Sequence, residues 1–156
     1  MLVQLTCVVV DADASNRLEM ATFLANHGVH VASQLPNADQ LPQLLATATG
    51  PQLVVINLDP SPHDSLKRIG PYIRKFPNVS FFVLSQTVDP QLLMDAMHLG
   101  VREFVPLPIV EEKFAAGIER VAQVYGMGKR AKIIHLIPTV GGCGSTTVAC
   151  NIAASL

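Results

Sequence analysis

The sequence contains no tryptophan, and aromatic residues of all kinds make up only 5% of its 156 residues. Charged residues are also scarce, at 15%, whereas hydrophobic residues reach 49%. This balance excludes an intrinsically disordered chain and supplies enough apolar side chains for a buried core. The length predicts one domain, or one domain and part of a second.

Long apolar runs, signal-peptide features and paired cysteines are missing as well. No stretch approaches the roughly 18 consecutive apolar residues of a transmembrane helix, and residues 1–4 lack the basic segment that opens a signal peptide. Cys7, Cys143 and Cys150 are odd in number and widely spaced, which predicts reduced thiols in a cytosol. The net charge of −1 predicts no general attraction to nucleic acid or to an anionic membrane. We therefore expect a cytoplasmic protein that neither binds nucleic acid nor inserts directly into a membrane.

Strand-like and helix-like segments alternate five times between residues 3 and 125. The run from Leu53 to Ile56 is continuously apolar, which is typical of a strand buried on both faces of a parallel sheet. Asp89 and Pro90 begin a helix that Gly100 ends. This alternation predicts an α/β fold with a doubly wound parallel sheet. Strands are expected over residues 3–10, 29–33, 53–56, 79–84 and 103–105; helices are expected from a cap at Ser15 or Asn16 to about 26, and over 37–47, 65–76, 90–99 and 110–125.

Three short segments resemble, in order and spacing, the receiver domain of two-component response regulators. Residues 52–58 (QLVVINL) resemble the third-strand motif whose sixth position is the phosphorylated aspartate. Residues 84–86 (LSQ) resemble the fourth-strand segment that carries a switch hydroxyl, and residues 100–108 resemble the segment that ends in Lys-Pro. The resemblance implies a flavodoxin-like (CheY-like) fold over residues 1–126, with a five-stranded parallel sheet and helices on both faces.

The positions that carry the chemistry of a receiver have changed in this chain. Asn57 stands in place of the phosphorylated aspartate, and a neutral amide cannot form an acyl phosphate. Asp11 matches the first metal-binding acid, but Ala12 occupies the second position. Leu107 stands where a lysine would pair with the phosphoryl group. We predict a degenerate phosphoacceptor site without catalytic residues, made of Asp11, Asp13, Asn57, Asp59, Ser85 and Leu107.

Three acidic residues leave a metal site to be considered. Asp59 lies two residues beyond Asn57, so in extended structure both would point to the same side. Asp11, Asp13 and Asp59 could then hold a hard cation through oxygen ligands. Alternatively, each is a residue at the end of a loop, with Asp59 in a turn before Pro60. We favour the second interpretation and predict no metal and no cofactor.

A glycine-rich turn lies between an apolar run at residues 133–137 and a helix-like run at 148–156. This is the layout of a P-loop, in which backbone N–H groups surround phosphates; a flexible turn is the alternative. The segment resembles the deviant Walker A loop of MinD/ParA-type ATPases, but Val140 and Ser145 stand in place of its two lysines. Losing one such charge costs about 10²–10³ in rate, so we expect no hydrolysis. The degenerate nucleotide loop comprises Gly141, Gly142, Gly144, Ser145 and Thr146, the last at the magnesium-ligand position.

The two resemblances together define an expected domain organisation. Residues 1–126 form the degenerate receiver domain, 127–131 a linker, and 132–156 the N-terminal fragment of a MinD/ParA-like P-loop domain, which indicates a piece of a longer protein. The order resembles the CpaE/TadZ family of tight-adherence (Flp, type IVc) pilus assembly proteins. That resemblance implies a non-catalytic module that self-associates, contacts other pilus or secretion proteins, and localises them at the inner membrane or a cell pole. The alternatives are a phosphotransfer regulator that uses Asp59 or Asp13, and a nucleotide-dependent ATPase.

Receiver domains commonly pair through their fourth helix, fifth strand and fifth helix, here residues 90–125. Leu92, Leu93 and Ala96 are expected to face the sheet. An exposed apolar patch would then remain on the fourth helix, and a homodimer is the most common arrangement for such a patch. The alternative is that Met97 fills the core. The predicted interface consists of Met94, Met97, His98 and Val101.

Overall fold

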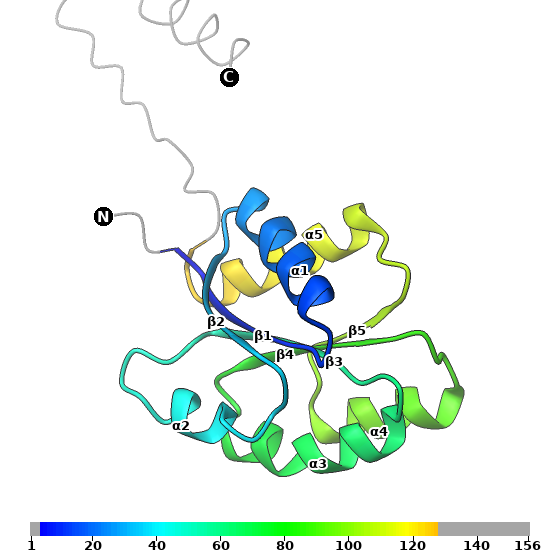
Figure 1. The fold of residues 1–156 in the computed structure, drawn as a ribbon. Coiled ribbons are helices and arrows are strands. Elements are labelled where there is room, and N and C mark those ends of the chain that lie inside the picture. Colours follow the sequence, from blue (N-terminus) through cyan, green and yellow to red (C-terminus); the bar gives the residue numbers. More distant parts are fainter. Residues whose placement is uncertain (1–3, 128–156) are drawn as a thin grey trace, which may run out of the picture.

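The computed structural model describes residues 4–127, which form five strands and five helices in strict alternation (Figure 1). This alternation confirms the predicted α/β fold. No helix among these residues is long and apolar enough to span a bilayer. The elements are β1 (Thr6–Val10), α1 (Ala14–Asn26), β2 (His30–Leu35), α2 (Leu41–Leu45), β3 (Leu53–Asn57), α3 (Pro62–Lys75), β4 (Ser80–Ser85), α4 (Pro90–Leu99), β5 (Glu103–Pro106) and α5 (Glu111–Val124).

The five strands form one parallel sheet in the order β2-β1-β3-β4-β5. Helices α1 and α5 cover one face of the sheet, and α2, α3 and α4 cover the other (Figure 1). This is the flavodoxin-like arrangement, in which the strand order reverses between β1 and β3. Ligands of such sheets bind beyond the carboxyl ends of the strands at this reversal. A ligand site is therefore expected at the loops that follow β1 and β3.

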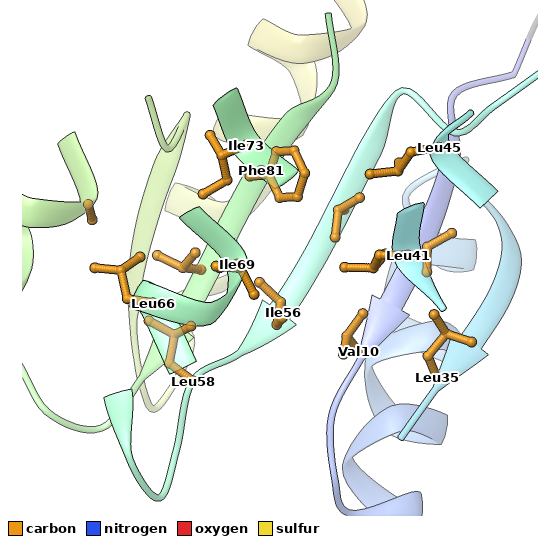
Figure 2. Close-up of a cluster of buried hydrophobic side chains, with 14 of the residues drawn as sticks. Val10, Leu35, Leu41, Leu45, Ile56, Leu58, Leu66, Ile69, Ile73 and Phe81 are labelled. Atoms are coloured by element: carbon orange, nitrogen blue, oxygen red, sulfur yellow. The ribbon is translucent and has the colours of Figure 1, made fainter. Parts of the chain in front are cut away.

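Two apolar clusters, one on each face of the sheet, form the core. Successive side chains along a strand point to opposite faces, so neighbouring residues of β1 and β3 enter different clusters. In the first cluster, Val10 and Ile56 lie beneath Leu41 of α2 and Ile69 of α3 (Figure 2). The second cluster, beneath α1 and α5, includes Cys7, Val9, Leu24, Val55, Phe82, Phe114, Ile118 and Val121.

Cys7 is completely buried in the second cluster, as its place in the first predicted strand indicated. Burial raises the pKa of the Cys7 thiol far above its ordinary value, and a weaker opposing contribution comes from the backbone of Val55. A buried thiol of this kind is unreactive and packs like a small apolar side chain.

Helix α4 begins and ends where the sequence predicted. Asp89 caps it by accepting hydrogen bonds from the N–H groups of Gln91 (2.8 Å) and Leu92 (3.2 Å), and His63 Nε2 lies 2.9 Å from the second carboxylate oxygen. Desolvation alone would raise the pKa of Asp89, but the Leu92 and Gln91 N–H groups, followed by His63, outweigh it and lower the pKa. At the other end, Gly100 adopts a φ of 93°, the left-handed conformation that glycine accommodates at a helix terminus.

Three predicted helix boundaries were wrong. Helix α1 is capped by Asp13 rather than by Ser15 or Asn16, because the Asp13 carboxylate accepts hydrogen bonds from both of those N–H groups. Helix α2 is a short Leu41–Leu45 segment instead of residues 37–47, since the Asn37 side chain accepts a hydrogen bond from the N–H of Asp39 in a local turn. Helix α3 begins at Pro62, three residues earlier than predicted, with proline in its first turn.

Candidate functional site

The carboxyl ends of three central strands bring the predicted phosphoacceptor residues to one edge of the sheet. Val10 pairs with Ile56 across β1 and β3, and Asn57 pairs with Leu84 across β3 and β4. The residues that end or follow these strands, Asp11, Asn57 and Ser85, are therefore neighbours in space although they lie far apart in the sequence. This edge is where a flavodoxin-like fold places its ligand site.

A direct hydrogen bond joins Asn57 to Asp11. The Asn57 Nδ2 atom donates to Asp11 Oδ2 at 2.8 Å, and both side chains are partly buried. The other carboxylate oxygen, Oδ1, accepts the backbone N–H of Asp13 at 2.8 Å. Both oxygens of Asp11 thus have neutral donors, and the amide nitrogen stands 2.8 Å from the carboxylate that would otherwise help to hold a metal. Asn57 fits this site as a neutral hydrogen-bond donor, in place of a nucleophile.

Asp59 and Ser85 form a second part of the same network. The Asp59 N–H donates to Asn57 Oδ1 at 3.0 Å. The Asp59 carboxylate accepts the Ser85 hydroxyl at 2.8 Å and the N–H of Gln86 at 2.8 Å. The Ser85 oxygen in turn accepts the N–H of Thr87 at 3.0 Å, and Ser85 is completely buried. The hydroxyl of Ser85, which the resemblance assigns as the switch hydroxyl, is therefore hydrogen-bonded to the Asp59 carboxylate.

The three acidic residues have separate structural roles. Asp11 binds Asn57, Asp59 binds Ser85, and Asp13 is exposed and caps α1. No three His, Cys, Asp or Glu side chains are grouped as metal ligands within residues 4–127. Asp11 follows β1, Asp59 follows β3, and Asp13 precedes α1.

Leu107 follows β5 at the same edge of the sheet. Its N–H donates to the Ser85 carbonyl at 2.9 Å, which fixes the position of the backbone. Its side chain is half-buried over the second core cluster and lines a pocket of about 890 Å³ between α1 and the β5–α5 loop. An apolar side chain therefore occupies the position where a receiver has its lysine. The pocket is lined by Val9, Asp11, Asn16, Glu19, Met20, Phe23, Asn57, Leu84, Gln86, Leu107, Pro108, Ile109 and Glu111.

Sequence reasoning missed part of this site. Gln86 supplies a backbone N–H to Asp59, and Glu19 and Met20 of α1 face the pocket with Ile109. These residues come from separate segments, and they form no sequence motif that would predict a shared site. The sequence of α1 gives no clear signal either, because its apolar residues are not gathered on one face.

The α4 surface agrees only in part with the predicted interface. Met94 is 53% exposed and Met97 is 75% exposed, so Met97 does not fill the core. His98 is also exposed. Val101 is half-buried and packs against the first core cluster, which makes it a smaller part of the exposed patch than predicted. As expected, Leu92 and Ala96 are buried, whereas Leu93 is only half-buried.

The predicted nucleotide loop, Gly141 to Thr146, lies outside the described residues. Of the predicted linker 127–131, the structure describes Met127 alone, and its side chain packs against the second core cluster.

The sequence matches no family model and no curated protein, whereas many solved structures share its fold. A pilus assembly-related protein from Burkholderia pseudomallei K96243 is 20% identical, with a TM-score of 0.70 over 85% of this chain and 97% of that one. A pilus assembly protein (CpaE) from Burkholderia thailandensis E264 is 22% identical, with a TM-score of 0.68 over 76% of this chain and 98% of that one.

Response regulators have the same architecture. A response regulator from Thermotoga maritima is 20% identical, with a TM-score of 0.64 over 78% of this chain and 99% of that one. At these identities the comparisons establish the fold alone: residues 4–127 adopt the CheY-like fold that receiver domains share.

Proposed function

We propose that this receiver domain is a non-catalytic interaction module of a pilus assembly protein, and that it helps to localise the machinery of a tight-adherence (Flp, type IVc) system. The observation that carries the proposal is the Asn57–Asp11 hydrogen bond of 2.8 Å, in which a neutral amide bound to the Asp11 carboxylate stands where a receiver has its nucleophile. Leu107 removes the charge that would stabilise a phosphoryl group. The similarity in fold to two proteins named for pilus assembly supports the choice of process.

The contacts of Asp59 and Asp13 argue against phosphotransfer through a substitute aspartate. Both oxygens of Asp59 already accept hydrogen bonds, and the Asp13 carboxylate caps α1. Among the residues that the structure describes, no lysine, arginine or histidine lines the pocket next to Asp11 and Asn57. A phosphoryl group would add up to two negative charges to either residue and would displace the hydrogen bonds that its carboxylate now accepts.

The proposal includes self-association and a cytoplasmic location, with recruitment to the inner membrane or a cell pole through other assembly proteins. The exposed Met94 and Met97 side chains support an interface on α4, because a monomer gains nothing from exposing methionine to water. The net charge of −1 supports partners other than nucleic acid.

Intact-mass spectrometry after incubation with acetyl phosphate and Mg²⁺ tests the non-catalytic assignment. We expect no added phosphate on the 156-residue chain under conditions that fully phosphorylate an active receiver domain run in parallel. A stoichiometric adduct that disappears in Asp59→Asn would overturn the proposal and support the phosphotransfer alternative.

A further inference from the structure

The pocket beside Leu107 combines an apolar floor with an open side. Met20 and Phe23 of α1, together with Leu107 and Ile109 after β5, pack on the second core cluster yet remain partly exposed. The volume of about 890 Å³ lies within the range of about 300–1,000 Å³ that is usual for ligand pockets. It is far larger than a single metal ion requires, and the floor offers no ligands to one.

Carboxylates line the rim of the pocket, and within residues 4–127 no lysine, arginine or histidine lines it. Asp11 is partly buried with only neutral donors on its oxygens, while Glu19 and Glu111 are exposed. Two basic side chains lie next to the rim: Arg17 Nη1 donates to the backbone carbonyl of Asp11 at 2.6 Å, and His27 Nε2 lies 3.6 Å from Glu111 Oε1. With histidine neutral, Arg17 offsets one of the three rim carboxylates, Asp11, Glu19 and Glu111, so the rim keeps a net negative charge.

The charge of the whole domain has the same sign. The chain has 12 acidic and 11 basic residues; every acidic residue lies within residues 4–127, but Lys129, Arg130 and Lys132 lie beyond them. Residues 4–127 thus carry 8 basic and 12 acidic side chains, a formal charge of −4 with histidine neutral. Such a field attracts basic partners and repels acidic ones.

We propose that this pocket binds a segment of a partner protein that places a lysine or arginine next to apolar side chains. The cation lies beside Asp11, in the space that Leu107 leaves uncharged, and the apolar side chains cover Met20 and Phe23. Apolar contact supplies most of the affinity, and the charge pair selects basic segments over acidic ones. This inference rests on the proposed function, because it requires an Asp11 carboxylate that is not occupied by Mg²⁺ and phosphate.

Nuclear magnetic resonance on the ¹⁵N-labelled 156-residue chain tests the inference. The probe is a synthetic amphipathic peptide of leucine and lysine, and the control is the same peptide with glutamate in place of lysine. We expect saturable, salt-sensitive shifts of the amides of Glu19, Met20 and Leu107 with the lysine peptide, and none with the glutamate peptide. Absence of binding, binding of both peptides, or shifts centred on α4 would each overturn the proposal. Shifts of these same pocket amides on concentrating the chain alone would also overturn it, because the occupant of the pocket would then be a second copy.

Two variants make the test specific to the pocket. Leu107→Lys supplies the missing charge from within and should weaken peptide binding about tenfold or more. Val124→Lys adds the same charge at a 64% exposed position near the other end of α5 and should leave binding unchanged. If Leu107→Lys does not fold, the exposed Glu19→Gln is decisive, with a weakening of about threefold expected from loss of a rim charge. If Leu107→Lys or Glu19→Gln bound the lysine peptide as tightly as the parent, the result would contradict the proposed site. A phosphate adduct would overturn the proposed function; absent binding without an adduct would overturn only this inference.

Discussion

Replacing Asn57 by aspartate changes one amide into a carboxylate and restores the residue type of an active receiver. The Asn57 amide donates to Asp11 at 2.8 Å, so Asn57→Asp brings two carboxylates together at the end of β1 and β3. The lost hydrogen bond to a charged group is worth about 1.5–3 kcal/mol. Repulsion adds at least about 1 kcal/mol at this partly exposed site. We expect the free energy of unfolding to fall by about 2–4 kcal/mol without Mg²⁺, which lowers the Tm by roughly 6–12 °C in a domain of this size.

Thermal unfolding followed by far-UV circular dichroism, at pH 7 with and without Mg²⁺, measures this effect. Magnesium should raise the Tm of Asn57→Asp, because two carboxylates can now share the cation, and should leave the parent unchanged. Asn57→Leu is the matched control, since it loses the hydrogen bond without adding charge and should not respond to Mg²⁺. If Asn57→Asp is as stable as the parent in magnesium-free buffer, the Asn57–Asp11 bond does not hold the site together.

Three further predictions concern the core, the cap of α4 and the α4 surface. Phe114 is 1% exposed and packs edge-on against two other phenylalanines, so Phe114→Ala should cost about 3–5 kcal/mol in urea denaturation; a cost below about 1 kcal/mol would contradict this packing. Because the folded state lowers the pKa of Asp89, the stability that Asp89 contributes is present above its unfolded value of 3.8 and is lost as the pH falls through the lower folded value. The urea midpoint of Asp89→Asn should therefore lie below that of the parent at pH 5–7 and approach it below pH 3.8, and a constant difference would refute the linkage. Light scattering should give a dimer mass for the parent and a monomer mass for Met94→Glu with Met97→Glu, whereas a monomeric parent at high concentration would eliminate this interface.

Most of the fold follows from local patterns in the sequence. The continuous apolar runs of β3 and β4 and the Asp89–Gly100 helix signals predicted their elements closely, because burial on two faces and helix capping both leave clear patterns. The start of α1 was misplaced because Asp13, Ser15 and Asn16 are all capping residue types, and only the backbone conformation decides among them. A local turn made by the Asn37 side chain shortened α2, and no propensity of the following residues revealed that competition.

The sequence predicted which residues belong to the candidate site, but it did not predict the contacts between them. The resemblance grouped Asp11, Asn57 and Ser85 in one site, and the parallel register brings the ends of their strands together at one edge of the sheet. The hydrogen bond between Asp59 and Ser85 could not be predicted from the alternation of side chains along a strand. That alternation applies only within β3, which ends at Asn57. The pocket also escaped prediction, since its walls come from α1 and from the loop after β5. Such a surface exists only after the sheet has brought both segments together.

Titration of the ¹⁵N-labelled chain with beryllofluoride and Mg²⁺, a mimic of the phosphorylated state, tests the central claim most directly. If the Asn57–Asp11 pair has replaced the phosphoryl site, the side-chain amide of Asn57 and the backbone amides of Asp11, Asp59 and Leu107 will not shift. Saturable shifts of these resonances would contradict the account, because they would show that the site still accepts a metal and a phosphoryl group.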